Sequence, residues 1–389
     1  MLNPLKTKDT KPKSTEYYDV IIVGAGICGT SLAYFLHQAG QKVLIIEKDK
    51  VASGGSGAAG AFISPKFTRD PLQLDLSQKA YAFALDFFNT NFPELIQNRP
   101  LLHLASSDQD QQKIAFYKEY HTAIATPESL KKCLKLDALA FENVFIEDAA
   151  MVNAQEVCEA LCKGVDIVYE TLDKMRQVDG EWVYAKARAK HLVLATGAYK
   201  DVINEEYLEV QGVWGHRINV KTAFENFYNI HQKVSISPTQ KEGYIAIGAT
   251  HDREYHPQKN RQAYCVKAGR KTLLEKANFS VDLGEVDVLE DFTGLRASYY
   301  DHLPVVGPLI NAKKTLENFP LLAKGTQVPS EQFCYYDNVS IINGVGGYGF
   351  SFAPYIASML ADAIIEGKAI EKIYQPLRLF KRWVKRVEK

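Results

Sequence analysis

The sequence predicts an α/β protein with two interleaved domains, and three observations support this class. A buried strand, a glycine-rich turn and a helix follow one another at 18–39. Two further strand–glycine turns lie far downstream, at 192–199 and 343–354, and strand-like segments dominate 211–250. A chain of 389 residues is long enough for two domains rather than one small one.

The composition is that of an ordinary globular protein, with 46% hydrophobic and 24% charged residues. The 46 basic residues balance the 46 acidic ones, which argues against a chain that coats nucleic acid but leaves a local basic patch open. The six cysteines form no Cys-x-x-Cys pair and the nine histidines are dispersed, so we expect buried thiols, a reducing compartment and no metal site. No apolar run approaches the ~20 residues of a membrane span, and we expect a cytoplasmic protein with no membrane partner.

The segment "YDVIIVGAGICG" carries a Gly-x-Gly-x-x-Gly pattern between the first strand and the first helix. Gly24 permits the tight turn, Gly26 lets the backbone approach a pyrophosphate, and Gly29 lets the helix pack close to the sheet. The N-terminus of that helix offers unpaired N–H groups to phosphates. Glu47, at the end of the next strand, can accept hydrogen bonds from ribose hydroxyls. These features in this order predict a dinucleotide site.

The spread of the glycine turns favours FAD over a nicotinamide cofactor, whose domain would be contiguous. We expect the turn in "LVLATGAY" to return the chain to the cofactor, and "NGVGGYGFSFAP" to present N–H groups to the flavin or its ribityl chain. The many small residues of "ASGGSGAAGAF" predict a close approach of backbone to cofactor. In these three segments the predicted contacts to non-covalent FAD are Thr196, Gly197, Gly346, Gly347, Gly349, Ser53, Gly54, Gly55 and Ser56.

The same segments predict how the chain is divided. We expect a Rossmann-like FAD-binding domain built from discontinuous segments, and a substrate domain with a mixed or antiparallel sheet. The predicted ranges are 1–16 for a disordered polar tail, 17–66, 147–205 and 291–389 for the FAD-binding domain, and 67–146 and 206–290 for the substrate domain.

The chain resembles the D-amino-acid oxidase and glycine oxidase family of FAD enzymes from residue 17 to about residue 366. The resemblance rests on "VIIVGAGICGTSLAYFLHQAG", "VASGGSGAAGAFISP", "LVLATGAY", "GLRASYYDHLPVVG" and "GGYGFSFAP". Within the family, the second and fourth segments are most similar to the FAD domain of bifunctional tRNA-modifying members. Those members oxidise a C–N bond and remove a carboxymethyl group from the modified wobble uridine of tRNA. The resemblance therefore implies oxidation of a glycine-like amine, with tRNA as the preferred carrier.

Two departures from those members bear on partners and on substrate binding. The tRNA-modifying members carry a methyltransferase domain before the FAD domain, where this sequence has 16 residues. The resemblance therefore implies a separate methyltransferase that acts next in the pathway. Many glycine-oxidase-like members also have an arginine in the C-terminal glycine turn, which here reads "GGYG" at 346–349. One obvious anchor is then left for the substrate carboxylate.

Arg296 is that predicted anchor, because a guanidinium can hold a carboxylate through two parallel hydrogen bonds and the family's matching position binds the substrate carboxylate. Its alternative role is a structural ion pair that holds the strand. Tyr348 is predicted to cap the pocket or bind substrate, with core packing as the alternative. His302 is predicted either to be structural or to lie near the flavin rim, with a direct catalytic role as a further possibility, while His251 and His256 are expected in a loop of the substrate domain.

Several alternatives stay open from the sequence. The substrate can instead be a free small amino acid such as glycine, sarcosine or a D-amino acid, and a non-catalytic flavin-binding protein is a further possibility. The electron acceptor and the oligomeric state are not fixed by any motif. The C-terminal "PLRLFKRWVKRVEK" combines an apolar stripe with a basic face, which fits either a docked helix or a contact to tRNA phosphates.

Overall fold

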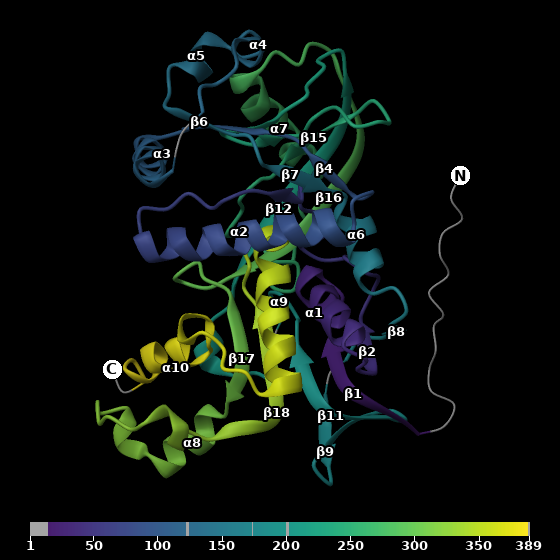
Figure 1. Cartoon of the computed structure of the whole chain (residues 1–389), viewed down its shortest axis with the longest axis vertical. Helices are drawn as coiled ribbons and strands as arrows, with labels where there is room; N and C mark the ends of the chain where they lie inside the picture. The colour runs from purple at the N-terminus through teal and green to yellow at the C-terminus, as the bar shows by residue number, and fades with distance from the viewer. Residues whose placement is uncertain (1–14, 122–123, 173, 200–201, 388–389) are drawn as a thin grey trace.

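The computed structural model describes residues 15–121, 124–172, 174–199 and 202–387 (Figure 1). The predicted tail, residues 1–16, lies almost entirely outside these residues, and strand β1 begins at Glu16. Within the described part of the chain, none of the helices is long and apolar enough to cross a membrane. The same residues contain no group of three or more His, Cys, Asp or Glu side chains arranged to hold a metal ion.

An eight-stranded sheet occupies the lower half of the molecule in Figure 1. Its order is β17–β18–β11–β1–β2–β8, with β10 paired to β11 and β9 paired to β10. Neighbours from β18 to β8 are parallel, whereas β17, β10 and β9 pair antiparallel. The strands are β1 (Glu16–Val23), β2 (Val43–Glu47), β8 (Asp166–Tyr169), β9 (Arg176–Val178), β10 (Glu181–Tyr184), β11 (Ala187–Leu194), β17 (Val305–Ile310) and β18 (Tyr335–Asn343).

Hydrophobic cores cover both faces of this sheet, which is why its central strands are nearly continuous apolar runs. Alternate residues of β1 point to opposite faces, Ile22 into one core and Ile21 into the other. Figure 1 shows α1 and α9 side by side on the first face, with α2 crossing their upper ends. These helices and α6, which shares their core, are α1 (Ile27–Gln38), α2 (Pro71–Asn91), α6 (Ala154–Leu161) and α9 (Gly349–Glu366).

The opposite face is covered by short helices. They include α8 (Ala312–Asn318), the 3-10 turn η1 (Glu206–Leu208) and α10 (Leu377–Val384). Three more 3-10 turns lie nearby in sequence: η2 (Pro320–Leu322), η3 (Ser330–Gln332) and η4 (Lys372–Tyr374).

A seven-stranded mixed sheet lies above the first one in Figure 1, in the order β16–β12–β15–β14–β13–β5–β6. Only the β13–β5 pair among these neighbours is parallel. Helix α7 (Val266–Ser280) packs on one face, against residues such as Ile218, Ile247 and Ile236. The strands are β5 (Leu101–Leu104), β6 (Asn143–Ile146), β12 (Gln211–Thr222), β13 (Asn229–His231), β14 (Ser235–Ile236), β15 (Ile245–Gly248) and β16 (Val286–Ser298).

A small third sheet connects the regions, with β7 (Ala150–Val152) between β3 (Phe62–Ile63) and β4 (Ile96–Asn98). Helices α3 (Asp108–Tyr120), α4 (Glu128–Lys131) and α5 (Leu136–Leu139) lie at the far end of the second sheet (Figure 1). The predicted α/β class with a mixed second sheet is observed. The domain ranges stay a prediction, and the boundary between 290 and 291 falls inside β16, which pairs with β12 along its length.

The C-terminal helix α10 is docked on the first sheet. Phe380 is fully buried, and Leu379 and Val384 are nearly so. The basic residues 378, 382 and 386 have protein partners: Arg378 hydrogen-bonds Asp301 from Nε at 2.7 Å, Arg382 lies over the Tyr300 ring, and Arg386 pairs with Glu209. Most of the predicted basic face is therefore engaged with the protein itself, whereas Lys381 and Lys385 are exposed.

Candidate active site

A cavity of about 580 Å³ is lined by residues of both larger sheets. It brings together residues that are far apart in the sequence: the turn after β1, the small-residue loop 51–61, the end of β16 and the turn before α9. All the predicted cofactor contacts except Gly29 line it, and so do Arg296, Tyr348 and His302. The cavity is thus the place where the three predicted glycine elements meet.

The first glycine turn shows why Gly29 is absent from the lining. A Cβ on Gly29 would collide with the Gly24 carbonyl oxygen, so this position serves the close packing of α1 on the strand end. Gly24 has φ +107°, a conformation that favours glycine. Gly26 does line the cavity, and a Cβ there would meet only the Ser56 Oγ, at 3.1 Å. Gly26 therefore keeps space open on the cavity side of the turn.

Glu47 organises the turn and the loop that follows it. Its buried carboxylate accepts hydrogen bonds from the Ala25 N–H at 2.8 Å, the Asp49 N–H at 3.1 Å and the Ser53 hydroxyl at 3.2 Å. A carboxylate offers about four acceptor positions, which leaves one for a ribose hydroxyl. Ser56, in the same loop, accepts from the Ile27 N–H at 2.9 Å, at the N-terminus of α1.

These features fit the dinucleotide part of FAD. The N-terminus of α1 meets the cavity, no large side chain projects from Gly24 or Gly26, and an acidic residue ends the second strand. Asn343 Nδ2 donates to the Gly197 carbonyl oxygen at 2.7 Å and so ties the second glycine turn to the third. The residues present would hold the cofactor along the carboxyl ends of the parallel strands.

Arg296 lies at the other side of the cavity, near the end of β16. Its guanidinium passes over Gly215 of β12, where a Cβ would lie 3.1 Å from Nη2. Nη2 donates to the Thr250 carbonyl oxygen, Nη1 lies 3.4 Å from His251 Nε2, and the buried Nε has no partner among the described residues. Burial lowers the pKa of Arg296 to about 10, so the side chain still carries its charge at neutral pH.

No ion pair joins Arg296 to a carboxylate anywhere in the described part of the chain. A desolvated guanidinium without a carboxylate partner is a strong site for an anion, because charge-assisted hydrogen bonds gain strength away from bulk water. Gly347, in the turn before α9, lies beside Nη1. Arg296 is therefore placed to hold a carboxylate close to the cofactor turn.

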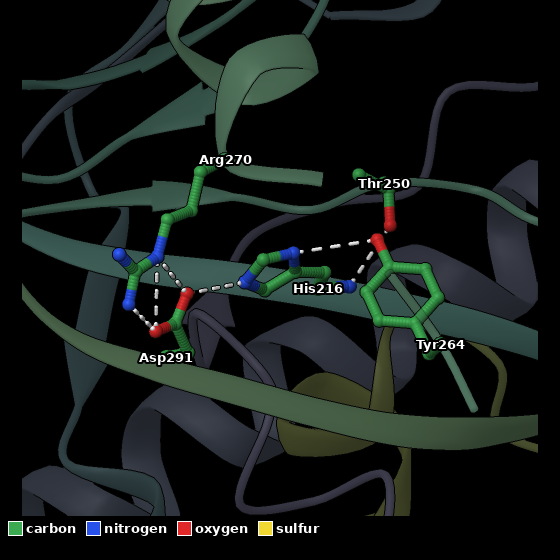
Figure 2. Close-up of polar contacts among 5 residues, drawn as sticks. All are labelled: His216, Thr250, Tyr264, Arg270 and Asp291. Carbon is green, nitrogen blue, oxygen red and sulfur yellow. Dashed lines mark hydrogen bonds and ion pairs between the residues drawn. The ribbon is translucent and has the colours of Figure 1, made fainter. Parts of the chain in front are cut away.

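A hydrogen-bonded network on the opposite face of the second sheet holds the Thr250 carbonyl in place. Figure 2 shows the fully buried His216 between Asp291 and Tyr264. His216 Nε2 lies 2.9 Å from Asp291 Oδ1, and its Nδ1 lies 3.3 Å from the Tyr264 hydroxyl. The backbone of His216 bonds Thr250 twice, through N–H to Oγ1 at 2.9 Å and through its carbonyl to the Thr250 N–H at 3.0 Å.

Arg270 of α7 completes the network by donating from Nε to both Asp291 oxygens, at 2.9 and 3.1 Å. The pKa of Asp291 is lowered chiefly by this hydrogen bond, so the residue is a carboxylate at neutral pH. The chain of contacts runs from Arg270 through Asp291 and His216 to Thr250 (Figure 2). The Thr250 carbonyl oxygen in turn accepts from Arg296. The Arg270–Asp291 ion pair thus supports the position of Arg296, the predicted substrate anchor.

Tyr348 and His302 also reach the cavity. Burial raises the pKa of the Tyr348 phenol to about 12, so it is a hydrogen-bond donor at neutral pH. His302 is exposed, and its carbonyl oxygen accepts from Lys66 Nζ at 2.9 Å. Burial is the main cause that lowers the pKa of His302, which leaves the ring neutral.

Sequence reasoning missed that Lys66 and His251 line the cavity. Burial lowers the pKa of Lys66 to about 8. His251 lies in the loop that follows β15, as expected, and that loop also brings it against Arg296, whereas His256 is not part of the cavity lining. Lys66 follows the "GAFISP" segment directly, and this position was the available signal for it.

We predict that valine has different effects on FAD binding and on folding when it replaces Gly26 and when it replaces Gly29. Gly26→Val should leave a folded protein whose FAD content falls about tenfold or more, because the new side chain occupies the pyrophosphate space. Gly29→Val should instead unfold the protein, because its Cβ collides with backbone. Absorbance of bound flavin and urea unfolding measure the two effects. Normal FAD content in Gly26→Val would show that the pyrophosphate lies elsewhere.

We also predict that Asp291→Asn weakens carboxylate binding without loss of FAD. The substitution removes the charged acceptor of His216 and Arg270, and a loss of about 1.4 kcal/mol would raise the Kd for glycolate about tenfold. Glycolate carries a carboxylate but no amine, so its titration into the oxidised protein reports on Arg296 alone. Asp287→Asn, at an exposed carboxylate of the same strand, is the control and should change nothing. An unchanged Kd in Asp291→Asn contradicts the positioning role.

Comparisons with known proteins agree with this site. The family model of FAD dependent oxidoreductases, DAO, matches residues 19–363. Two curated relatives are the tRNA 5-methylaminomethyl-2-thiouridine biosynthesis bifunctional proteins MnmC of Campylobacter fetus and Legionella pneumophila. They are 22% and 25% identical over 90% and 91% of this chain. The chain spans 57% and 55% of their length, so it corresponds to about half of each relative.

Solved structures show the same fold at lower sequence identity. Glycine oxidase from Geobacillus kaustophilus matches with a TM-score of 0.73 and 20% identity, covering 93% of this chain and 98% of that one. L-Proline dehydrogenase from P. horikoshii matches with a TM-score of 0.72 and 15% identity, covering 95% and 99%. The predicted family is confirmed, because the family model covers most of the chain and the fold is shared along its length. The chain belongs to the DAO family of FAD-dependent oxidoreductases, and FAD is its cofactor.

Proposed function

We propose that this oxidoreductase oxidises the C–N bond of a glycine-like amine, and that its preferred substrate is the carboxymethylaminomethyl uridine of tRNA. The observation that carries the proposal is the unpaired guanidinium of Arg296 in the cavity lining. It gives a site for the carboxylate of a carboxymethyl group beside the cofactor turn. The names of the MnmC relatives, which concern the biosynthesis of 5-methylaminomethyl-2-thiouridine in tRNA, support the choice of a modified uridine as substrate.

The cations around the cavity fit an amine that must react in its neutral form. Arg296, Lys66 and Arg253 line the cavity, and none has an ion-pair partner among the described residues. Positive charges nearby disfavour an ammonium group, so the substrate amine binds more easily without its extra proton. A carboxylate on the same substrate is attracted by the same charges. The cavity thus favours a substrate that carries a carboxylate together with a neutral amine.

Bound FAD supplies the acceptor for the hydride that leaves the substrate carbon. Arg296 fixes the carboxylate and, with it, the direction of the methylene C–H bond. Loss of the hydride leaves an imine, which water hydrolyses to glyoxylate and the aminomethyl uridine. Tyr348 is a neutral phenol at the cavity, available to donate a hydrogen bond to the substrate.

One exposed cation of the cavity lining adds support for an RNA substrate. Arg253 is exposed and lines the cavity, so it can contact a phosphate. A methyltransferase acting on the product is the partner that the tRNA proposal implies. A free small amino acid is the second candidate substrate, which the fold shared with glycine oxidase favours.

We predict that the purified protein converts the carboxymethylaminomethyl nucleoside of tRNA into the aminomethyl nucleoside. The measurement is mass spectrometry of nucleosides from tRNA incubated with the protein, with a heat-inactivated sample as control. Glycine and sarcosine are assayed alongside by anaerobic reduction of the flavin. Unchanged tRNA together with rapid flavin reduction by a free amino acid would establish the second candidate instead.

Arg296→Leu should keep its FAD but lose most of its activity on carboxylate-bearing amines. Truncating one side of a buried charge-assisted pair costs roughly 2–5 kcal/mol, which is about 30- to several-thousand-fold in kcat/KM. Arg296→Lys should recover only part of this, because an ammonium cannot form the planar fork. The measurement is anaerobic flavin reduction beside an absorbance scan for bound FAD. A wild-type rate with full FAD would place the anchor elsewhere, and loss of FAD or folding would make Arg296 structural.

A further inference from the structure

Two histidines lie side by side in a part of the cavity that the proposed chemistry does not use. His103 of β5 and His231 of β13 are direct register partners in the parallel pair of the second sheet. Both line the cavity, and their ring centroids are 6.1 Å apart. They come from positions 128 residues apart in the sequence and meet only through strand pairing.

Neither ring makes a hydrogen bond to any described residue, and two of the ring nitrogens, His103 Nδ1 and His231 Nε2, are sealed from solvent. Two other histidines differ: the fully buried His216 contacts Asp291, and the partly buried His191 contacts Ser340 at 3.0 Å. Leaving a buried polar atom unpartnered costs about 1–3 kcal/mol. A ligand in the cavity cannot reach these two sealed nitrogens, but the other nitrogen of each ring, His103 Nε2 and His231 Nδ1, is not sealed and is open to a ligand that lies against the pair.

The pair is neutral and has apolar walls. Burial lowers the pKa of His103 to about 4 and that of His231 to about 3. Asp110 and Lys113 act on His103 in opposite directions and pair with each other at 3.1 Å. The ring of Phe67 packs on His103 at 4.5 Å and that of Phe62 on His231 at 4.6 Å between centroids. The group that binds here is therefore expected to be uncharged, to be flat enough to lie against aromatic side chains, and to be able to donate and accept hydrogen bonds.

The second sheet sets the position of this pair relative to Arg296. Alternation along the strands sends Ile218, Ile236 and their neighbours toward α7 and leaves the other face to the cavity. On that open face, successive register partners line the cavity across four strands: Gly248, Ser235, His231 and His103. Strand β13 is four steps from β16 in the sheet order, which is roughly 19 Å between backbones at about 4.8 Å per step.

Arg296 and the histidines thus act at two ends of one cavity, with their side chains filling part of the distance. A free glycine held by Arg296 is too short to reach the two histidines at the other end of the cavity. A glycine unit attached to a pyrimidine has a flat ring beyond its amine, with a donor N–H beside an acceptor carbonyl. A neutral imidazole offers one acceptor and one donor, which matches such an edge.

We propose that His103 and His231 form a subsite for the pyrimidine ring of the substrate, where the ring nitrogens accept from its N3–H and donate to its carbonyl oxygen. This inference rests on the proposed oxidation of a uridine-borne amine. It adds that the base is recognised inside the cavity, so the modified nucleoside alone carries much of the specificity.

The test uses the full-length FAD-loaded protein and two substrates, 5-carboxymethylaminomethyluridine as the free nucleoside and sarcosine. In His103→Phe and His231→Phe, the half-saturating nucleoside concentration for anaerobic flavin reduction should rise roughly 10- to 100-fold. The value for sarcosine should change less than about twofold. His121→Phe, at a histidine outside the cavity lining, is the matched control and should alter neither value.

A second measurement needs no variant and stays decisive if the phenylalanine variants lose FAD. The N3-methylated nucleoside cannot donate from N3, so the wild-type protein should bind it as weakly as the variants bind the parent nucleoside. Equal effects of the variants on nucleoside and sarcosine, or tight binding of the N3-methyl nucleoside, would overturn the subsite. A wild-type protein that oxidises sarcosine but neither the nucleoside nor tRNA would overturn the proposed function and the subsite with it.

Discussion

The rest of the structure depends on the close approach of backbone segments at the first glycine turn. A Cβ on Gly24 would lie 2.5 Å from the Ala195 carbonyl oxygen, and one on Gly29 would collide with Gly24 itself. This approach brings the N-terminus of α1 to the carboxyl ends of β1 and β11, where Glu47 fixes the Ala25 N–H. The cofactor end of the cavity exists because a helix N-terminus and two strand ends meet there without side chains between them.

At the Arg296 end of the cavity, the two faces of the second sheet have different roles. The face toward α7 carries aliphatic side chains together with the buried His216–Asp291 pair, which holds the Thr250 carbonyl. The other face has glycine at 215, which leaves room for the Arg296 guanidinium. The absence of a side chain at Gly215 on one face and the hydrogen bonds between His216 and Thr250 on the other face both hold Arg296 in place. Its position is therefore set by the sheet rather than by a partner charge.

From the sequence we could predict only those parts of the site whose geometry depends on the local backbone. A turn at positive φ or a close backbone approach demands glycine, so Gly24, Gly29 and Gly346 could be recognised without knowing the fold. The histidine pair could not, because His103 and His231 meet through a parallel pairing whose register no local pattern encodes. Lys66 was missed for a related reason: its lowered pKa comes from burial by segments distant in sequence. The C-terminal segment left two possibilities open for the same kind of reason, since the partners of its basic residues, such as Asp301 and Glu209, lie 77 and 177 residues away.

The electrostatics of the cavity also sets the direction in which a substrate binds. Arg296 is a buried cation with no carboxylate partner in the described part of the chain, so an anion gains most by binding there. Protonated histidines at the other end would offer a second site for the same anion and allow the reverse orientation. Burial holds His103 and His231 neutral at physiological pH, and this removes the competing site. Under the proposed function, a cation at one end and neutral imidazoles at the other favour binding of the carboxylate at Arg296, with the uncharged part of the substrate pointing away from it.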